Sequence, residues 1–396
     1  MASSARIVAA GAPPAAIRAS GPPRPIRVLH FHSSKGLYGP ERWTHLALRA
    51  LAGTGVEQEV LTIGTKPGYD DFARFLAREG FRAHHLDLGG KLALRQIVGI
   101  RSRVVDGRFG VLHTHGFKSD ILGYLATRGL PIGLVTTPHG WCDHESFRIR
   151  AYETVGRNLL RRFDRVYPLS DHQLEALGPY RLGPKVRRIR NAVDIAAFDD
   201  VYAQRRTSTP SQPTVLFVGR LVREKGLFDL IEATGLVARR RACRLVIAGA
   251  GPGADEARTI AARAGIADRI ELTGFVEDVR RHLLGATVLA LPSYSEGIPR
   301  VVMEAFAAGV AVVGTEIPGL RELVRSGHSG MLVPVGDVVA LADAIDTLLG
   351  DAATNRRLAE QARTLVERDY SPHRLAAELL EEYQALVGGR ADGNQA

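Results

Sequence analysis

An alternation of strand-like and helical stretches, repeated in two halves of the chain, constrains the fold most. In the first half, strand-like stretches lie at 26–32, 57–63, 82–87, 110–114, 132–137 and 164–168. After a polar break at 205–213 the alternation restarts, with strand-like stretches at 214–218, 244–248, 269–273, 286–291 and 310–314. Strands that alternate with helices are typical of parallel sheets with both faces covered. The sequence therefore predicts an α/β protein of two Rossmann-like, doubly wound domains that face a central cleft.

The length of 396 residues suits two domains, and an apolar share of 45% allows each a sizeable core. We expect an N-terminal domain over 25–200, a linker over 201–212, a C-terminal domain over 213–370 and a last helix over 371–388. Residues 1–24 and 389–396 are expected to be disordered tails. The first tail is rich in Ala, Gly, Pro and Ser and lacks the apolar centre of a signal peptide.

The stretch 292–309 combines the end of a strand, a tight loop and the start of a helix. Doubly wound sheets bind ligands at the carboxyl ends of their strands, so this loop is a candidate site. The first N–H groups of a helix lack an intrahelical partner and can bind a phosphate. Here they belong to Gly297, Arg300 and Val301. Glu296 in the loop and Glu304 in the helix can accept hydrogen bonds from hydroxyl groups. A nucleotide-sugar carries both a diphosphate and hydroxyl groups.

A second motif, at 215–226, places two cations between the end of a strand and the start of a helix. Arg220 and Lys225 can neutralise a diphosphate there, and each charged hydrogen bond contributes about 1.5–3 kcal/mol. The alternative is a solvated basic loop, and we expect that for Arg223.

Two histidine loops follow strands in the first half, at 111–116 and 136–141. Histidine can donate to a sugar hydroxyl or act as an acid or base, although a single histidine is more often structural. We expect His113 to belong to the core. His115 and His139 are candidate site residues, His115 either facing an acceptor or simply packing.

Together these motifs resemble those of family 4 glycosyltransferases, which have the GT-B fold, and the resemblance covers about residues 26–388. It implies that Glu296 contacts the donor sugar, that Glu304 holds the ribose and that His139 lies against the donor sugar. It also implies that the last helix crosses back onto the first domain. The catalytic residues it implies are His139, Glu296, Arg220 and Lys225.

The resemblance extends to two further loops. Residues 37–42 resemble the family's first glycine-rich loop, in which Gly39 is kept while Tyr38 stands where relatives often have a second glycine. Residues 272–278 resemble the loop that contacts the base, near Val276. The donor-binding residues implied are Gly39, Arg220, Lys225, Val276, Glu296, Gly297, Ile298, Arg300, Val301 and Glu304. The acceptor-side candidates are His115 and Tyr38.

The resemblance implies a retaining hexosyltransferase for cell-surface polysaccharide biosynthesis, with a UDP- or GDP-sugar as donor and a glycan or lipid-linked acceptor. Fixed cations and the lack of an Asp-x-Asp motif predict that no metal and no further cofactor is needed. The alternatives are a nucleotide-sugar epimerase of the same fold and a non-catalytic nucleotide-sugar binder.

The net charge of +10 arises mostly in the first half. Nucleic acid is not an expected partner, because no zinc-finger spacing or aromatic RNA-binding motif occurs. The segment 147–163 predicts a helix that touches an anionic membrane surface, or else a solvated surface helix. Its arginines are Arg148, Arg150, Arg157, Arg161 and Arg162, and Arg187, Arg188 and Arg190 are expected to add to the same basic field.

The two cysteines, Cys142 and Cys243, lie far apart in sequence and favour a reducing compartment over a disulfide framework. No apolar run reaches the roughly 18 residues needed to span a bilayer. We therefore expect a cytoplasmic protein at the inner face of the cytoplasmic membrane.

Overall fold

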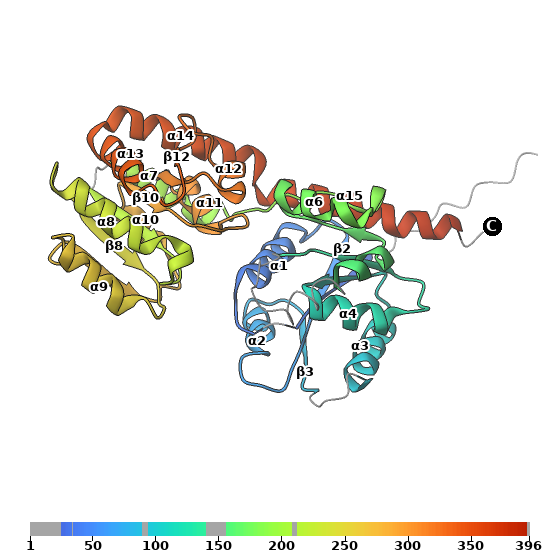
Figure 1. The fold of residues 1–396 in the computed structure, drawn as a ribbon. Helices are drawn as coiled ribbons and strands as arrows, with labels where there is room; N and C mark the ends of the chain where they lie inside the picture. Colours follow the sequence, from blue (N-terminus) through green and yellow to red (C-terminus); the bar gives the residue numbers. More distant parts are fainter. Residues whose placement is uncertain (1–24, 34, 89–93, 140–155, 208–211, 394–396) are drawn as a thin grey trace, which may run out of the picture.

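The computed structural model describes residues 25–33, 35–88, 94–139, 156–207 and 212–393. Within them the chain forms two parallel six-stranded sheets, each in its own domain (Figure 1). The predicted α/β fold with two doubly wound domains is confirmed. The expected tail over 1–24 and Cys142 lie outside the described residues, and Cys243 is a buried free thiol.

The first sheet has the strand order β3-β2-β1-β4-β5-β6. The chain therefore builds outward from β1 to β3, then returns to the other side of β1 with β4 and continues to β6, so the topological switch point lies between β1 and β4. Its strands are β1 (Ile26–His32), β2 (Val56–Ile63), β3 (Ala83–Leu86), β4 (Val111–His115), β5 (Gly133–Thr136) and β6 (Arg165–Val166). Its helices are α1 (Gly39–Ala50), α2 (Asp71–Arg78), α3 (Leu94–Asp106), α4 (Phe117–Thr127) and α6 (Asp171–Leu177). The register pairs His30 with His113 and His32 with His115 across β1 and β4.

The second sheet repeats the pattern in the order β12-β11-β10-β7-β8-β9. Its strands are β7 (Thr214–Val218), β8 (Arg244–Ala248), β9 (Ile270–Gly274), β10 (Val288–Leu291), β11 (Ala311–Thr315) and β12 (Met331–Val333). Its helices are α8 (Leu227–Ala238), α9 (Ala254–Arg263), α10 (Arg280–Gly285), α11 (Arg300–Ala307), α12 (Pro318–Leu323), α13 (Val338–Gly350) and α14 (Ala352–Asp369). The sequence did not predict β12, which is a three-residue strand at the sheet edge.

The stretch expected to be a linker, 201–212, begins inside a helix, α7 (Asp199–Thr207). Val201 is buried in the core of the second domain. The guanidinium of Arg205 donates hydrogen bonds to backbone carbonyls at the end of α10, including Leu283 at 2.8 Å. The polar residues from 205 onward led us to expect a linker. Arg205 instead belongs to a packed helix, because its guanidinium binds backbone carbonyl groups of the protein and not water.

The last helix, α15 (Pro372–Gly393), leaves the second domain and packs on the first sheet (Figure 1). Its buried side chains share a core with β1, β4 and α1, and they include Leu375, Leu379, Tyr383 and Leu386. The helix continues to Gly393, so residues 389–393, which were expected to lie in a disordered tail, are helical. The domains also meet at Glu322 on α12, which accepts a hydrogen bond from the backbone N–H of Asp171 at 3.0 Å.

Candidate active site

The stretch 292–309 has the predicted form, with β10 ending at Leu291 and α11 beginning at Arg300. Pro299 is extended and directly precedes the helix, and Gly309 follows it with a φ of 67°. The N-terminus of α11 therefore lies at the carboxyl edge of the second sheet, where parallel sheets bind ligands.

Lys225 and Glu296 form an ion pair at this edge. The Nζ of Lys225 lies 2.5 Å from Oε1 of Glu296, and the same oxygen accepts a hydrogen bond from the Ser293 hydroxyl at 2.9 Å. Both charged side chains are largely shielded, with 20% and 11% of their surface exposed. The site thus holds one cation and one carboxylate in contact.

Backbone contacts hold the two loops together. The N–H of Tyr294 donates to the carbonyl of Glu224 at 2.9 Å. Gly226 has a φ of 67°, and a Cβ there would lie 1.9 Å from the carbonyl oxygen of Pro292. Only glycine allows this approach, so Gly226 determines where Lys225 stands.

A second ion pair lies one turn further along α11. Arg300 Nη2 is 2.6 Å from Glu304 Oε1, and Glu304 is buried. Burial raises the pKa of the Glu304 carboxyl, although the charges of Arg300 and Arg42 oppose this effect. Arg42 comes from α1 of the first domain, and burial and the charge of Arg300 lower its pKa. Sequence reasoning did not single out Arg42, even though it is the last residue of the glycine-rich stretch 37–42.

The remaining predicted donor-site residues of the second domain follow the ends of β7, β9 and β10 or lie in the first turn of α11. Arg220 is exposed at the end of β7, and Gly297 is exposed in the loop before α11. Val276, Ile298 and Val301 are partly buried against the core of the second domain.

Tyr38 and Gly39 lie at the start of α1. Tyr38 precedes the helix and 68% of its surface is exposed, while its backbone N–H donates to Oε2 of Glu41 at 2.9 Å. Gly39 is the first helical residue. The exposed ring of Tyr38 is thus available to a ligand.

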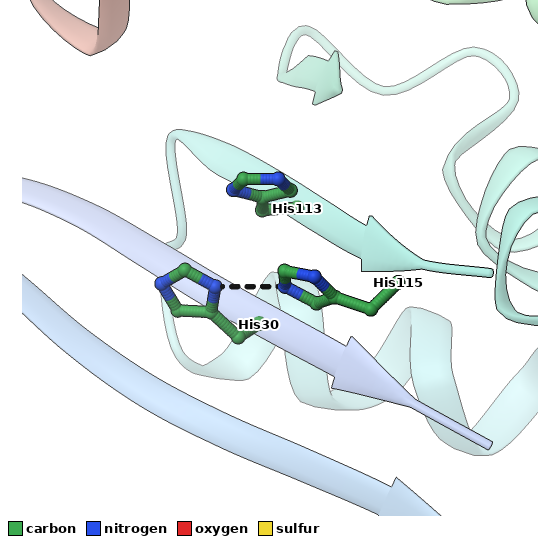
Figure 2. Close-up of side chains that lie close together, drawn as sticks. All are labelled: His30, His113 and His115. Atoms are coloured by element: carbon green, nitrogen blue, oxygen red, sulfur yellow. Dashed lines mark hydrogen bonds between the residues drawn. The ribbon is translucent and has the colours of Figure 1, made fainter. Parts of the chain in front are cut away.

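The predicted histidines belong to a larger cluster at the carboxyl edge of the first sheet. His115 Nε2 lies 3.0 Å from His30 Nδ1, and His115 Nδ1 lies 3.0 Å from His139 Nε2. Figure 2 shows the rings of His30, His113 and His115 facing one another from the neighbouring strands β1 and β4. His113 is buried, as expected for a core residue, and bonds the hydroxyl of Tyr383 at 2.7 Å.

His30 was missed, although a signal was present. Residues i and i+2 of a strand share a face. His30 and His32 alternate along β1 as His113 and His115 do along β4. Pairing the two patterns across parallel strands predicts one histidine cluster.

The segment expected to touch a membrane lies mostly outside the described residues, which omit 140–155 and hence Arg148 and Arg150. Arg161 and Arg162 are exposed. The three arginines expected to add to this field are each within ion-pair distance of a carboxylate, namely Arg187 with Glu382, Arg188 with Asp171 and Glu322, and Arg190 with Glu378. None of the described helices is long and apolar enough to cross a bilayer.

One described pocket lies away from this edge. Three of its lining residues lie just before strands. Pro213 and Thr287 directly precede β7 and β10, and Gly309 lies two residues before β11. The pocket therefore lies at the amino edge of the second sheet. The charged pairs and the histidines, in contrast, lie at the carboxyl edges.

Two doubly wound domains bridged by a returning last helix fit the GT-B fold of glycosyltransferases, and comparisons with known proteins identify the family. The glycosyl transferase 4-like domain matches residues 38–192, and the family described as glycosyl transferases group 1 matches residues 200–365. The phosphatidyl-myo-inositol mannosyltransferase of Mycobacterium leprae is 30% identical over 73% of this chain and 76% of that protein. This chain therefore belongs to the group 1 glycosyltransferases, as the resemblance predicted.

Two further comparisons are informative. The putative colanic acid biosynthesis glycosyltransferase WcaL of Salmonella typhimurium is 34% identical over 65% of this chain and 66% of that protein. The structure of Anabaena Alr3699/HepE in complex with UDP and glucose shares the fold, with a TM-score of 0.75 and 20% identity over 91% of this chain and 100% of that one. Two other curated relatives match over less than half of their own length, 44% and 48%.

Proposed function

We propose that this protein is a hexosyltransferase that moves a sugar from a nucleotide-sugar donor to a glycan or lipid-linked acceptor. The observation that carries the proposal is the contact between Lys225 and Glu296 beside the N-terminus of α11. A cation and helix N–H groups suit a diphosphate, and a carboxylate suits a sugar hydroxyl. Membership of a glycosyltransferase family supports the same activity.

In this proposal the second domain binds the donor. Lys225, Arg220 and the N–H groups of α11 neutralise the diphosphate as it leaves. Glu296 receives a sugar hydroxyl, which we assign to Oε2 because the bonds from Lys225 and Ser293 go to Oε1. Glu304 receives the ribose hydroxyls, and Val276 lies near the base.

The first domain supplies His139, which contacts the donor sugar, and an acceptor side that includes His115 and Tyr38. The acceptor hydroxyl attacks the anomeric carbon from the face that the diphosphate leaves, so the configuration is retained. Its proton passes to the leaving diphosphate oxygen. Fixed cations perform the neutralisation that a metal ion performs in other phosphate sites.

A UDP- or GDP-sugar is the proposed donor, and HepE, whose structure holds UDP and glucose, supports a uridine nucleotide. Cell-surface polysaccharide biosynthesis is the proposed setting. The relationship to WcaL, which is named for colanic acid biosynthesis, supports it.

A panel of UDP-, GDP- and ADP-sugars in a thermal-shift assay tests donor binding, because a ligand that binds the folded state raises the melting temperature. Incubation with the stabilising donor then separates the candidate functions. A transferase consumes donor when an acceptor is added, whereas an epimerase converts the sugar without acceptor. Stabilisation without either reaction indicates a binder and contradicts the proposal.

Attachment to an anionic inner membrane surface stays a prediction. The exposed arginines Arg161 and Arg162 support it, while the ion pairs of Arg187, Arg188 and Arg190 reduce the expected field. Co-sedimentation with anionic and neutral vesicles at low and high salt tests it. Equal sedimentation with both vesicle types would contradict attachment.

A further inference from the structure

The histidine cluster of the first domain contains a continuous chain of hydrogen bonds. It runs from Gln58 on β2 through His30 on β1 and His115 on β4 to His139. Gln58 Oε1 lies 3.2 Å from His30 Nε2, and the two following steps between ring nitrogens are each 3.0 Å. Figure 2 shows the central step, between His30 and His115.

One end of this chain has a fixed polarity. The side-chain amide nitrogen of Gln58 donates to the backbone carbonyl of Leu48 at 3.3 Å. A carbonyl oxygen can only accept a hydrogen bond, so the amide nitrogen must face Leu48 and the amide oxygen must face His30. Because that oxygen is also only an acceptor, His30 must carry its proton on Nε2.

Each later step then follows from the one before. A neutral histidine has one N–H and one acceptor nitrogen, so a proton on Nε2 leaves Nδ1 of His30 as an acceptor. His115 must donate to it from Nε2, which leaves Nδ1 of His115 as an acceptor. His139 must in turn donate from Nε2, and its own Nδ1 is left with a lone pair.

The rings are neutral because His30 and His115 are buried and His139 is half-buried beside them. Burial lowers the pKa of His30 and of His139 to about 3, and it lowers the pKa of His115 well below its usual value. Trp43 packs against the last two histidines of the hydrogen-bonded chain, with ring centroids 5.7 Å from His115 and 5.4 Å from His139. A single proton per ring is therefore the stable state at neutral pH.

We propose that Gln58, His30 and His115 are positioning residues that fix His139 in the Nε2–H tautomer, so that its Nδ1 accepts a hydrogen bond from a hydroxyl of the donor sugar. The contact with the sugar rests on the proposed function, but the tautomer does not. The backbone carbonyl of Leu48 thus determines, through the side chains of Gln58, His30 and His115, that Nδ1 of His139 is an acceptor. A sugar that presents a hydroxyl to Nδ1 is bound, and one that lacks this hydroxyl leaves the lone pair without a donor.

A metal site is the competing explanation for the same cluster. Ligand atoms of His30, His113 and His115 lie within 4.8 Å of one another. However, both ring nitrogens of all three histidines already have partners, which for His113 are Tyr383 at 2.7 Å and Thr137 at 2.8 Å. A metal ion would have to break these bonds, so the hydrogen-bonded chain is favoured.

The direct test is long-range ¹H–¹⁵N NMR on the donor-free full chain with ¹⁵N-labelled histidine, which distinguishes protonated from unprotonated ring nitrogens. The substitution His139→Gln identifies the His139 signals by their loss. We expect His139 in the wild-type protein to be protonated on Nε2. A proton on Nδ1 would overturn the proposal, and this outcome does not depend on whether the protein transfers sugar.

The variant Gln58→Leu removes the group that fixes the polarity. We expect both tautomers of His139 to appear and kcat/KM for the donor to fall about 3- to 10-fold, the effect of losing one hydrogen bond. Gln96→Leu is the matched control, because the Gln96 amide also donates to a carbonyl, that of Leu88 at 2.8 Å, and belongs to α3 and not to the hydrogen-bonded histidine chain. If the folded Gln58→Leu variant keeps the wild-type tautomer of His139, the hydrogen-bonded chain does not fix that tautomer and the proposal is contradicted.

Metal analysis completes the test. The purified protein and a sample incubated with Zn²⁺ are compared by elemental analysis and by the same NMR spectra. We expect no shift of the His30 and His115 signals on adding Zn²⁺. One equivalent of bound metal that shifts these signals would overturn the proposed chain of hydrogen bonds, because a nitrogen bound to metal cannot accept a hydrogen bond.

Discussion

The two sheet edges that carry the candidate site differ in how they use polar groups. The edge of the second domain holds full charges in contact, with Lys225 beside Glu296 and Arg300 beside Glu304. The edge of the first domain holds neutral rings that bond one another, with His115 between His30 and His139. A diphosphate is bound by fixed positive charge, whereas a sugar hydroxyl can be bound either by a carboxylate or by a neutral ring nitrogen. The contrast matches the proposed division of the donor between the two domains.

The largest expected effect concerns stability in acid, and it should arise in the first domain. Burial lowers the pKa of His30, His113, His115 and His139, so the unfolded chain binds protons below about pH 6.5 that the folded chain does not. Stability should therefore fall as the pH falls, by up to about 1.4 kcal/mol per pH unit for each histidine. Burial raises the pKa of Asp120 to about 7, which opposes the trend with one proton.

Urea unfolding at pH 7.5 and 5.5, followed by tryptophan fluorescence, measures this slope, because both tryptophans lie in the first half of the sequence. The control is His328→Gln in the second domain, which removes an exposed histidine outside the cluster. A midpoint that is the same at both pH values would show that the histidines are not buried as neutral rings.

The next largest effect concerns the charged edge. Lys225→Ala and Arg220→Ala should each lower kcat by about 100-fold, the usual cost of losing a group that stabilises developing charge. Turnover should fall far more than stability, because Arg220 is exposed and because Glu296 keeps its hydrogen bond from the Ser293 hydroxyl when Lys225 is removed. Steady-state kinetics and thermal unfolding measure the two quantities separately.

Arg223→Ala is the matched control, because Arg223 lies in the same loop but pairs with Glu256 at the surface. It should retain the activity of the wild-type protein. Full activity in both the Lys225 and Arg220 variants would remove the charged edge from the mechanism.

A smaller effect is expected for Glu304→Gln, which should raise the Kd for the free nucleotide about 10-fold. The amide has one acceptor atom in place of two, and it releases Arg300 from its ion pair. Isothermal titration with UDP and GDP measures the change. Glu271→Gln, at an exposed carboxylate near Arg244, is the control, and equal affinity of the Glu304 variant and the wild type would exclude the ribose role.

The smallest expected effect is that of a chelator. Activity should be the same with and without EDTA, since Lys225, Arg220 and the helix N–H groups supply the positive field. Turnover assays after dialysis against EDTA measure this. A complete loss that a divalent ion restores would show that the fixed cations are insufficient.

The sequence predicted the fold because strand-like and helical stretches alternate in both halves of the chain. This alternation is visible without knowing which strands pair. It failed at α7, where a polar composition concealed a helix whose Arg205 binds carbonyl groups of α10. It also placed the end of α15 too early.

Some residues of the candidate site could likewise be predicted from the local sequence, and others could not. Glu296 and Lys225 could be predicted because each stands in a recognisable loop, although their contact requires the approach that Gly226 allows. Arg42 and Gln58 could not, because their importance depends on residues in another domain or on another strand. Contacts between elements distant in sequence leave no local pattern.

The return of α15 to the first domain has a mechanical consequence. The chain passes between the domains once before Val193 and again after Tyr370, and the N–H of Val193 donates to the carbonyl of Tyr370 at 3.0 Å. Two connections that are hydrogen-bonded side by side restrict the relative rotation of the domains more than a single connection would.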